Sequence, residues 1–193
     1  MPDHAPSLDD ILEQAVEALE SAAADPGHPF RWVCLATVDP NGYPRLRTMV
    51  LRGFDWSERR LTFYTDARSA KVAELDERPR GEALVYDPST KRQVRLSGLV
   101  VLETGPEADG GIWKQLPPKA RINYATVHPP GDPIPDPAEG KPVQNPETLS
   151  GKTFCAVHLV IEAIDIVELG RESHLRARFA IFDAKVDGTW VTP

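Results

Sequence analysis

The sequence predicts a mainly β protein, an antiparallel barrel or sandwich with a few short helices. Two observations lead to this fold class. Short segments of alternating apolar and polar residues recur along most of the chain, and turn-forming residues separate several of them. Only a few stretches repeat at the spacing of a helix. The 193 residues suffice for one hydrophobic core, so we expect 1–193 to form a single domain.

Helical spacing is clearest at the start of the chain. Apolar residues recur every three or four positions over about 7–24, behind Ser7 as an N-cap, and "DPGHP" ends the pattern. A second, short helix is expected over 68–77 because Pro79 follows it. The segment 111–125 can also carry helix.

The alternating segments define the expected strands. Asn41 and Gly42 suit the turn of a hairpin between the first two strands, and an Asp187-Gly188 turn is expected before the last. Proline is so frequent over about 128–150 that we expect a covering loop there. The strands are expected at 31–38, 45–54, 60–65, 82–86, 91–103, 154–169, 174–184 and 189–193.

Charge and cysteine content exclude several classes of protein. The net charge of -7 argues against nucleic-acid or anionic-membrane partners, which require surplus lysine and arginine. The chain starts with acidic residues and has no apolar run of membrane-spanning length, so we expect a cytoplasmic protein. Cys34 and Cys155 lie far apart without metal-ligand spacing, so we expect two buried free thiols and no metal.

The segment "RLRTMVLRGF" (45–54) places arginines in an apolar strand. Side chains alternate along a strand, so Arg47 shares one face with Met49 and Leu51 while Arg52 points to the other. An unpaired guanidinium among apolar residues is costly, and Arg47 therefore needs an anionic partner. That partner is either a carboxylate of the protein or a bound anion.

Two further segments add polar groups. In "YTDARSAK" (64–71) a strand ends and a helix begins, and the hydroxyls and cations at this helix N-terminus suit a phosphate. The alternative is a solvated turn in which Ser69 only caps the helix. In "RQVRLSG" (92–98), the amide of Gln93 can donate and accept hydrogen bonds, which suits the pyrimidine edge of a flavin or nucleobase. The alternative is a solvent-facing strand side.

Together, "RTMVLRG", "FYTDARSAK" and "RQVRLSG" resemble, in order and spacing, the motifs of the FMN-binding split-barrel family typified by pyridoxamine 5'-phosphate oxidase. The resemblance covers about 30–103, and "ARINYATVHPPG" resembles an oxidase-related branch of that family. It implies a split β-barrel, an antiparallel Greek-key or meander sheet with short peripheral helices. It also implies FMN as cofactor and a homodimer with the flavin at the subunit interface.

The resemblance implies an FMN site made by these segments. Arg47, Ser69 and Lys71 would hold the phosphate. The family often has a second arginine where this chain has Ala70, and Arg68, two residues earlier, is the expected substitute. The other expected contacts are Thr48, Met49 and Val50 along the isoalloxazine, Arg52 near its polar edge, Tyr64 and Thr65 beside the phosphate and ribityl arm, and Gln93 on the ring.

The C-terminal segment "ELGRESHLRARF" resembles the family's ending less closely. Arg178 falls where the family has an FMN-contacting arginine, and Pro193 matches a terminal proline, but Glu168 replaces a tryptophan. His174 and Arg176 occupy, in reversed order, the two positions that contact substrate in the oxidase. We therefore expect weak or no turnover of pyridoxamine 5'-phosphate.

The function expected from the resemblance is that of an FMN-dependent oxidoreductase, with hydride transfer through flavin N5 and a small-molecule substrate. The sequence offers no obvious general base, so no catalytic residue is assigned. Two alternatives stay open. One is an FMN-binding carrier or sensor without turnover, and the other is a split barrel that holds heme or another cofactor.

Overall fold

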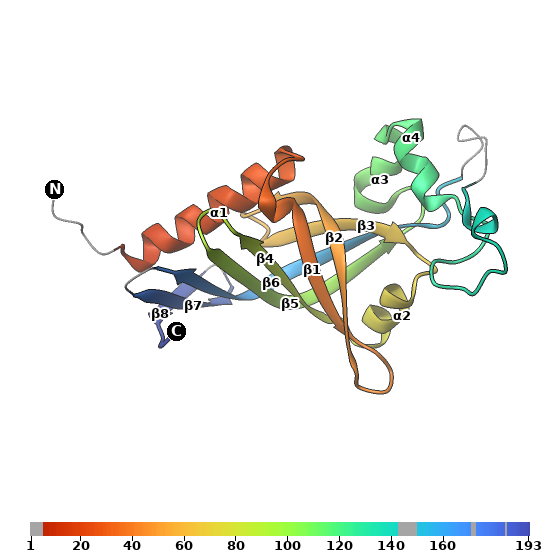
Figure 1. Cartoon of the computed structure of the whole chain (residues 1–193). Helices are drawn as coiled ribbons and strands as arrows, with labels where there is room; N and C mark the ends of the chain where they lie inside the picture. The colour runs from red at the N-terminus through yellow and green to blue at the C-terminus, as the bar shows by residue number, and fades with distance from the viewer. Residues whose placement is uncertain (1–5, 143–149, 171–172, 184) are drawn as a thin grey trace.

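The computed structural model describes residues 6–142, 150–170, 173–183 and 185–193. Within these ranges, eight strands form one antiparallel sheet in the order β3-β2-β1-β4-β5-β6-β7-β8, and a β3–β6 pairing closes the first six into a barrel (Figure 1). The expected mainly β split barrel is confirmed. The strands are β1 (Trp32–Val38), β2 (Pro44–Asp55), β3 (Arg60–Asp66), β4 (Arg80–Asp87), β5 (Arg92–Thr104), β6 (Phe154–Leu169), β7 (His174–Phe182) and β8 (Lys185–Trp190).

Strand alternation decides which side chains fill the barrel. In β1, Val33 and Leu35 are fully buried, whereas Trp32, on the other face, is 60% exposed. The same rule buries Leu159 and Ile161 of β6 in one continuous apolar core. Because apolar side chains occupy the interior, a ligand site has to lie at an end of the barrel or on its outer face.

The N-terminal helix α1 (Leu8–Ala24) is found where helical spacing predicts it. Ser7 and Asp10 form a capping box, in which the Asp10 N–H donates to Ser7 Oγ at 3.1 Å and the Ser7 N–H donates to Asp10 Oδ2 at 2.8 Å. The helix buries its apolar stripe against the barrel and extends toward β7 and β8 (Figure 1). A short turn, η1 (Pro29–Arg31), connects it to β1.

The glycine of "RQVRLSG" is Gly98, and the pairing of β5 with β6 explains why a glycine stands there. The β5–β6 register shifts between Ser97 and Gly98, where the ladder contains a bulge. A Cβ atom at position 98 would lie 1.9 Å from the carbonyl oxygen of Val160, a contact that no side chain tolerates. This glycine therefore serves the close approach of two strands and not a ligand.

The predicted Asp187-Gly188 turn is wrong, and the last strand, predicted at 189–193, runs from Lys185 to Trp190 instead. The β7–β8 hairpin pairs Phe182 with Lys185, and Gly188 lies inside β8 opposite Phe179. A Cβ atom at Gly188 would come within 2.7 Å of the Phe179 ring. Packing against this ring requires the glycine, so a tertiary contact overrides the local turn signal.

The helices after α1 gather at the other end of the barrel (Figure 1). There Trp113, Tyr124 and Phe154 form a second, smaller apolar cluster. The expected proline-rich loop starts at this end, and we call residues 126–142 the strap, while its predicted part at 143–149 lies outside the described residues. The elements here are α2 (Ala70–Glu77), α3 (Ala108–Gln115), α4 (Pro118–Arg121), η2 (Ile122–Tyr124) and η3 (Pro137–Gly140).

The two cysteines differ in environment. Cys155 is buried, and burial raises the pKa of its thiol to about 11, whereas Cys34 is only half-buried. The prediction of two buried thiols is therefore wrong for Cys34, which lies on the outer face of β1. No helix in the described ranges is long and apolar enough to cross a membrane.

Candidate functional site

Arg47 lies at the helix-covered end of the barrel. Its backbone pairs with Leu35 of β1, and its guanidinium turns toward α2. Nη2 donates to Glu74 Oε2 at 2.9 Å, and Nη1 donates to the Leu35 carbonyl oxygen at 3.3 Å and to Thr37 Oγ1. Glu74 is buried, so it supplies the protein carboxylate that the sequence allowed as one alternative. Sequence reasoning did not identify Glu74.

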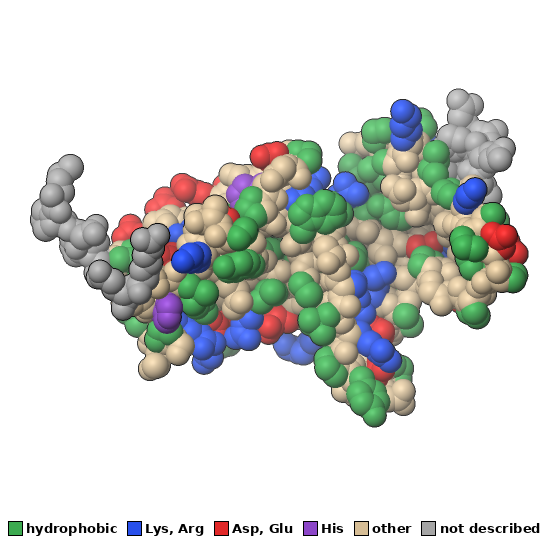
Figure 2. Space-filling view, in the orientation of Figure 1, with side chains coloured by type: hydrophobic (Ala, Val, Ile, Leu, Met, Phe, Trp, Pro, Cys, Tyr) green, Lys and Arg blue, Asp and Glu red, His purple; other side chains and the backbone are tan. Residues whose placement is uncertain are grey.

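Arg47 also lines an open pocket of about 410 Å³. One side of this pocket is the first half of β2, another is the start of α2, and the third is the strap. Figure 2 shows a group of Lys and Arg side chains in this part of the surface, between the β1–β2 hairpin and the α3–α4 end. The lining residues are Arg47, Thr48, Met49, Ser69, Ala70, Lys71, Pro130 and Gly131.

The start of α2 is arranged differently from a capped surface helix. Ser69 is the N-cap residue, yet its side chain caps no backbone N–H, and its Oγ donates to the Asp66 carbonyl oxygen at 2.7 Å. The first turn of α2 contains no acidic residue. Lys71 Nζ donates to Thr65 Oγ1 at 3.0 Å, a hydroxyl and not a carboxylate. The helix N-terminus therefore faces the pocket with a cation beside it.

The electrostatics of this pocket favour an anion. Burial lowers the pKa of Lys71 below its ordinary value, and the positive charge of Arg47 lowers it further. A phosphate between these two cations would remove this repulsion, and the hydroxyls and amides at the helix start would donate to its oxygens. The residues present therefore fit the phosphate of FMN.

Arg68 has other partners. Its guanidinium donates to Asp66 and to the strap carbonyls of Thr126 and Val127, and Arg68 does not line the phosphate pocket. The prediction that it replaces the missing arginine at Ala70 therefore has no support from its geometry. The sequence could not show this, because the strap lies 58 residues further along the chain.

Of the residues expected along the flavin ring, Thr48 and Val50 lie on the outer face of β2, whereas Met49 turns inward and packs in the barrel core. Thr48 and Met49 line the pocket itself, whereas Arg52 lies close to Tyr124, where it opposes the rise in the pKa of Tyr124 that burial causes. The Tyr64 hydroxyl donates to Asp109 Oδ2 at 2.7 Å, and burial and this bond raise the pKa of Tyr64. Val50 and Thr65 are on the same two strands.

Gln93 and Arg178 are not brought to this pocket within one chain. Gln93 pairs with Tyr86 of β4 and Val167 of β6, so β4 and β1 separate it from β2. Arg178 lies on β7, which is outside the six-stranded barrel. His174 is exposed at the start of β7, and Glu168 accepts a hydrogen bond from Arg92 Nε at 2.6 Å.

Arg178 belongs to a second arginine cluster, centred on Asp165 of β6. Asp165 accepts from Arg95 Nη2 at 2.9 Å, from Arg176 Nε and Nη2 at 3.0 and 2.8 Å, and from Arg178 Nε at 2.9 Å. These bonds hold the pKa of Asp165 far below its ordinary value, although burial opposes them. Sequence reasoning missed Asp165, but a single carboxylate in the apolar run "AIDIV" is a signal that a cation has to meet it.

An antiparallel barrel with a cationic pocket at its helix-covered end suits a ligand that carries a phosphate. Residues 10–104 match the family model for the FMN-binding domain of pyridoxamine 5'-phosphate oxidase. Residues 10–104, just under half of the chain, thus resemble the FMN-binding domain of this split-barrel family, whose cofactor is FMN.

Curated relatives carry the name pyridoxine/pyridoxamine 5'-phosphate oxidase. One from Rhodopseudomonas palustris (strain TIE-1) is 37% identical over 112 residues, which are 58% of this chain and 50% of the relative. One from Sinorhizobium fredii is 44% identical over 90 residues, which are 47% of this chain and 42% of the relative. The chain thus spans about half the length of the curated relatives it matches.

Two solved structures resemble the whole chain. A protein of Nostoc punctiforme described as pyridoxamine 5'-phosphate oxidase-related and FMN binding is 28% identical, with a TM-score of 0.76 over 94% of this chain and 96% of its own. PhzG from Burkholderia lata, solved with tetrahydrophenazine-1-carboxylic acid, is 20% identical, with a TM-score of 0.74 over 100% of this chain and 99% of its own. The second likeness shows the fold alone.

Proposed function

We propose that this protein is an FMN-dependent oxidoreductase related to pyridoxamine 5'-phosphate oxidase. The observation that carries the proposal is the pocket in which Arg47 and Lys71 lie beside the uncapped start of α2. When bound, FMN supplies hydride acceptance at its N5 atom. The names of the curated relatives support an oxidase-like activity.

Within this proposal the chain's own residues bind and orient the cofactor. Arg47 and Lys71 neutralise the phosphate, and Ser69 and Thr65 lie beside it. Glu74 keeps the Arg47 guanidinium in place, because it accepts a hydrogen bond from Nη2 while the Arg47 side chain lines the pocket. The outer side of β2, with Thr48 and Val50, is the surface for the ring, and Arg52 lies further along the same strand.

A homodimer completes this site. Gln93 and Arg178 lie away from the pocket of their own chain, so each reaches a flavin most directly from a second copy. The outer face of the sheet exposes Trp32 (60%), Leu46 (66%) and Tyr86 (43%), which a partner would cover. A two-fold dimer makes two equivalent sites. Light scattering on FMN-loaded protein tests this, and a monomer at micromolar concentration with full flavin occupancy would contradict it.

The substrate differs from that of the oxidase itself in this proposal. Arg176, at an expected substrate position, donates hydrogen bonds from two of its nitrogens to Asp165. Glu168, which stands where the family has a tryptophan, forms an ion pair with Arg92. We therefore expect weak turnover of pyridoxamine 5'-phosphate. Steady-state oxidation at about 1 per second or faster would contradict this expectation.

The cofactor and the activity need separate experiments. Purified protein is expected to be yellow and to release FMN, not FAD, on denaturation, and a colourless protein that fails to bind added FMN would refute the proposal. Anaerobic mixing with candidate reductants then tests turnover. A flavin that is reduced by a small molecule and reoxidised by oxygen identifies an enzyme, whereas a flavin that no candidate reduces identifies a carrier or sensor.

A further inference from the structure

Among the hydrogen bonds of the described residues, those of the Arg68 side chain link the strap to the barrel. On one side, Arg68 Nε and Nη2 donate to Asp66 Oδ1 and Oδ2 at 3.0 and 2.7 Å, and Asp66 is only 4% exposed. On the other side, Nη1 donates to the Val127 carbonyl oxygen at 3.1 Å and Nη2 to the Thr126 carbonyl oxygen at 2.9 Å. A buried carboxylate therefore fixes the guanidinium, and the guanidinium fixes two strap carbonyls.

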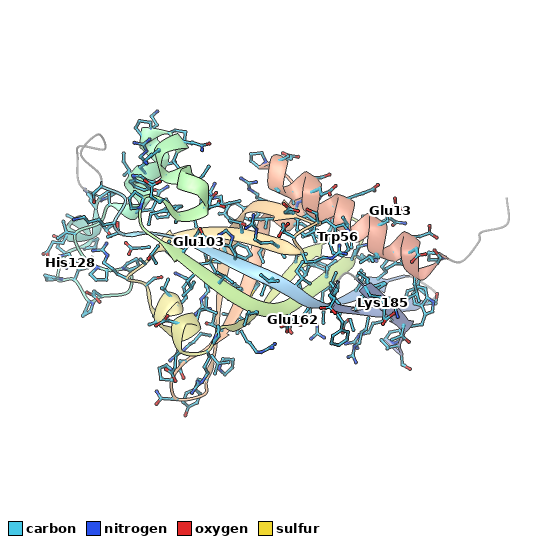
Figure 3. The ribbon with its side chains drawn as sticks, turned by 180° about the vertical axis from the view of Figure 1, so that it is seen from behind. Glu13, Trp56, Glu103, His128, Glu162 and Lys185 are labelled. Atoms are coloured by element: carbon cyan, nitrogen blue, oxygen red, sulfur yellow. The ribbon has the colours of Figure 1, made fainter. Side chains whose placement is uncertain are left out.

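The strap reaches the phosphate pocket only three residues after this anchor. Pro130 and Gly131 form one wall of the pocket that Arg47 and Lys71 line from the barrel side. Figure 3 shows His128, next to the anchor, at the same end of the molecule as Glu103 at the end of β5. The pocket wall opposite the barrel side is therefore made by the strap, through Pro130 and Gly131.

The chain between the anchor and the wall is short and stiff. Thr126 Oγ1 donates to the His128 carbonyl oxygen at 2.8 Å, and consecutive prolines at 129 and 130 restrict their own φ angles. Gly131 has φ +98, a conformation that glycine adopts without strain. A displacement of the anchor is therefore transmitted to the pocket wall.

Acidic groups of both the barrel and the strap stabilise the charged form of Arg68. The hydrogen bonds to Asp66 raise the pKa of Arg68, and the nearby charge of Asp132 on the strap raises it further. Arg68 thus stays cationic and interacts with acidic groups on both sides, the barrel and the strap.

We propose that Arg68 is a positioning residue that holds the strap against the barrel, so that Pro130 and Gly131 close one side of the FMN phosphate pocket. Arg68 acts through the strap and does not touch the phosphate. The inference rests on the proposed FMN site, and it assigns to the strap the role of retaining the cofactor's phosphate end.

Hydrogen–deuterium exchange on the cofactor-free protein tests the anchor directly. In Arg68→Ala we expect amides of 126–134 to exchange about ten-fold faster, because charge-assisted hydrogen bonds are lost, while amides of the barrel strands keep their rates. Arg78→Ala is the matched control, since Arg78 holds the carbonyls of Asp39 and Pro40 in the β1–β2 hairpin, away from the strap. Unchanged exchange of 126–134 in Arg68→Ala would overturn the proposal.

The rate of FMN release tests the consequence for the pocket. We expect Arg68→Ala to release FMN about ten-fold faster at a temperature at which the variant stays folded, and Arg78→Ala to release it at the wild-type rate. Arg68→Lys keeps the charge but cannot bridge Asp66 and two carbonyls with one ammonium group, so it should behave like Arg68→Ala. Wild-type release from Arg68→Lys would overturn the proposal in favour of a direct charge effect on the phosphate. If the wild-type protein binds no FMN, the proposed function fails, and the exchange measurement still decides the role of Arg68.

Discussion

Two clusters of basic side chains in this protein differ in which group has its pKa shifted. At the start of α2, Arg47 and Lys71 lie beside an open pocket, and the pKa of Lys71 is lowered. Across β5, β6 and β7, Asp165 holds Arg95, Arg176 and Arg178, and it is the pKa of the carboxylate that is lowered. Figure 2 shows both groups of basic side chains, the second along the lower edge between β5 and β7.

The difference separates a ligand site from a structural network. A lysine with a lowered pKa lies close to another positive charge or out of water, so a bound anion is stabilised there. A carboxylate with a lowered pKa is held by its cations, and at Asp165 one negative charge fixes the positions of three guanidiniums before any ligand binds. The number of arginines in a segment therefore says less about anion binding than which member of the cluster has the shifted pKa.

The largest expected effect on FMN binding comes from a substitution in the first cluster. Arg47→Ala should weaken FMN binding by roughly 2 to 4 kcal/mol, because a charge-assisted contact is lost and the phosphate is left with fewer cations. Titration of cofactor-free protein with FMN, followed by flavin fluorescence, measures this. Wild-type affinity in a folded Arg47→Ala protein would remove Arg47 from the site.

This variant needs a control because Arg47 also pairs with buried Glu74. Loss of the guanidinium leaves a buried carboxylate without its cation, which destabilises the fold by itself. In Arg47→Ala/Glu74→Gln that charge is absent, so the melting temperature should rise above that of Arg47→Ala. The FMN affinity should stay low in both.

The second expected effect is on stability and comes from a substitution in the Asp165 cluster. Asp165→Asn should lower the free energy of unfolding at neutral pH by about 2 kcal/mol. A neutral amide then replaces the carboxylate that accepts hydrogen bonds from three guanidiniums. Denaturant melts measure the change. FMN affinity should change far less than in Arg47→Ala, and an equal loss in both variants would contradict the distinction between the clusters.

The same variant has a signature in acid. Asp165 has a lower pKa in the folded protein than in the unfolded chain, so its contribution is full above about pH 4 and is lost as the pH falls further. Wild-type stability should therefore fall more steeply below pH 4 than that of Asp165→Asn. Parallel stability curves in that range would contradict the assigned role.

Most of the fold could be predicted from the sequence because local physics decides it. Ser7 starts α1 through its capping box, and alternation in β1 alone tells buried Val33 and Leu35 from exposed Trp32. One exception is Gly188, where contact with the Phe179 ring overrides the local turn signal, and that contact depends on the pairing of β7 with β8.

The site could be predicted only in part because its partners come from distant segments. The need of Arg47 for an anion follows from its apolar neighbours, but the choice of Glu74 among 29 acidic residues depends on where α2 packs. The cation beside the helix start follows from "RSAK", whereas the turn of Arg68 toward the strap does not. Residue type therefore predicted that these charged side chains need partners of opposite charge or hydrogen-bond acceptors. Only the tertiary structure shows which groups those partners are.

The third effect concerns Lys71. Lys71→Ala should weaken FMN binding by about 1 to 2 kcal/mol, less than Arg47→Ala, because the Lys71 side chain makes a single hydrogen bond, to Thr65, and no carboxylate fixes its position. Its lowered pKa also predicts a pH dependence. A bound phosphate raises that pKa, so binding takes up a proton, and affinity should fall as the pH rises toward the ordinary lysine value of about 10.4. Lys71→Arg stays charged in this range and should show a flatter curve, whereas identical curves would exclude Lys71 as the titrating group.

The smallest effect distinguishes two arginines inside the Asp165 cluster. Within the described residues, Arg176 meets Asp165 through two nitrogens and is 23% exposed, whereas Arg178 meets it through Nε alone and is 54% exposed. Asp165 therefore orients Arg178 while leaving its outer nitrogens toward solvent, where a second copy of the chain would bring its flavin. We expect Arg178→Ala to weaken FMN binding by about 1 kcal/mol in the dimer, and Arg176→Ala to leave FMN affinity unchanged while lowering stability. Titrations of both variants, with light scattering to verify the dimer, measure the difference, and an equal effect of the two substitutions would mean that the whole cluster is structural.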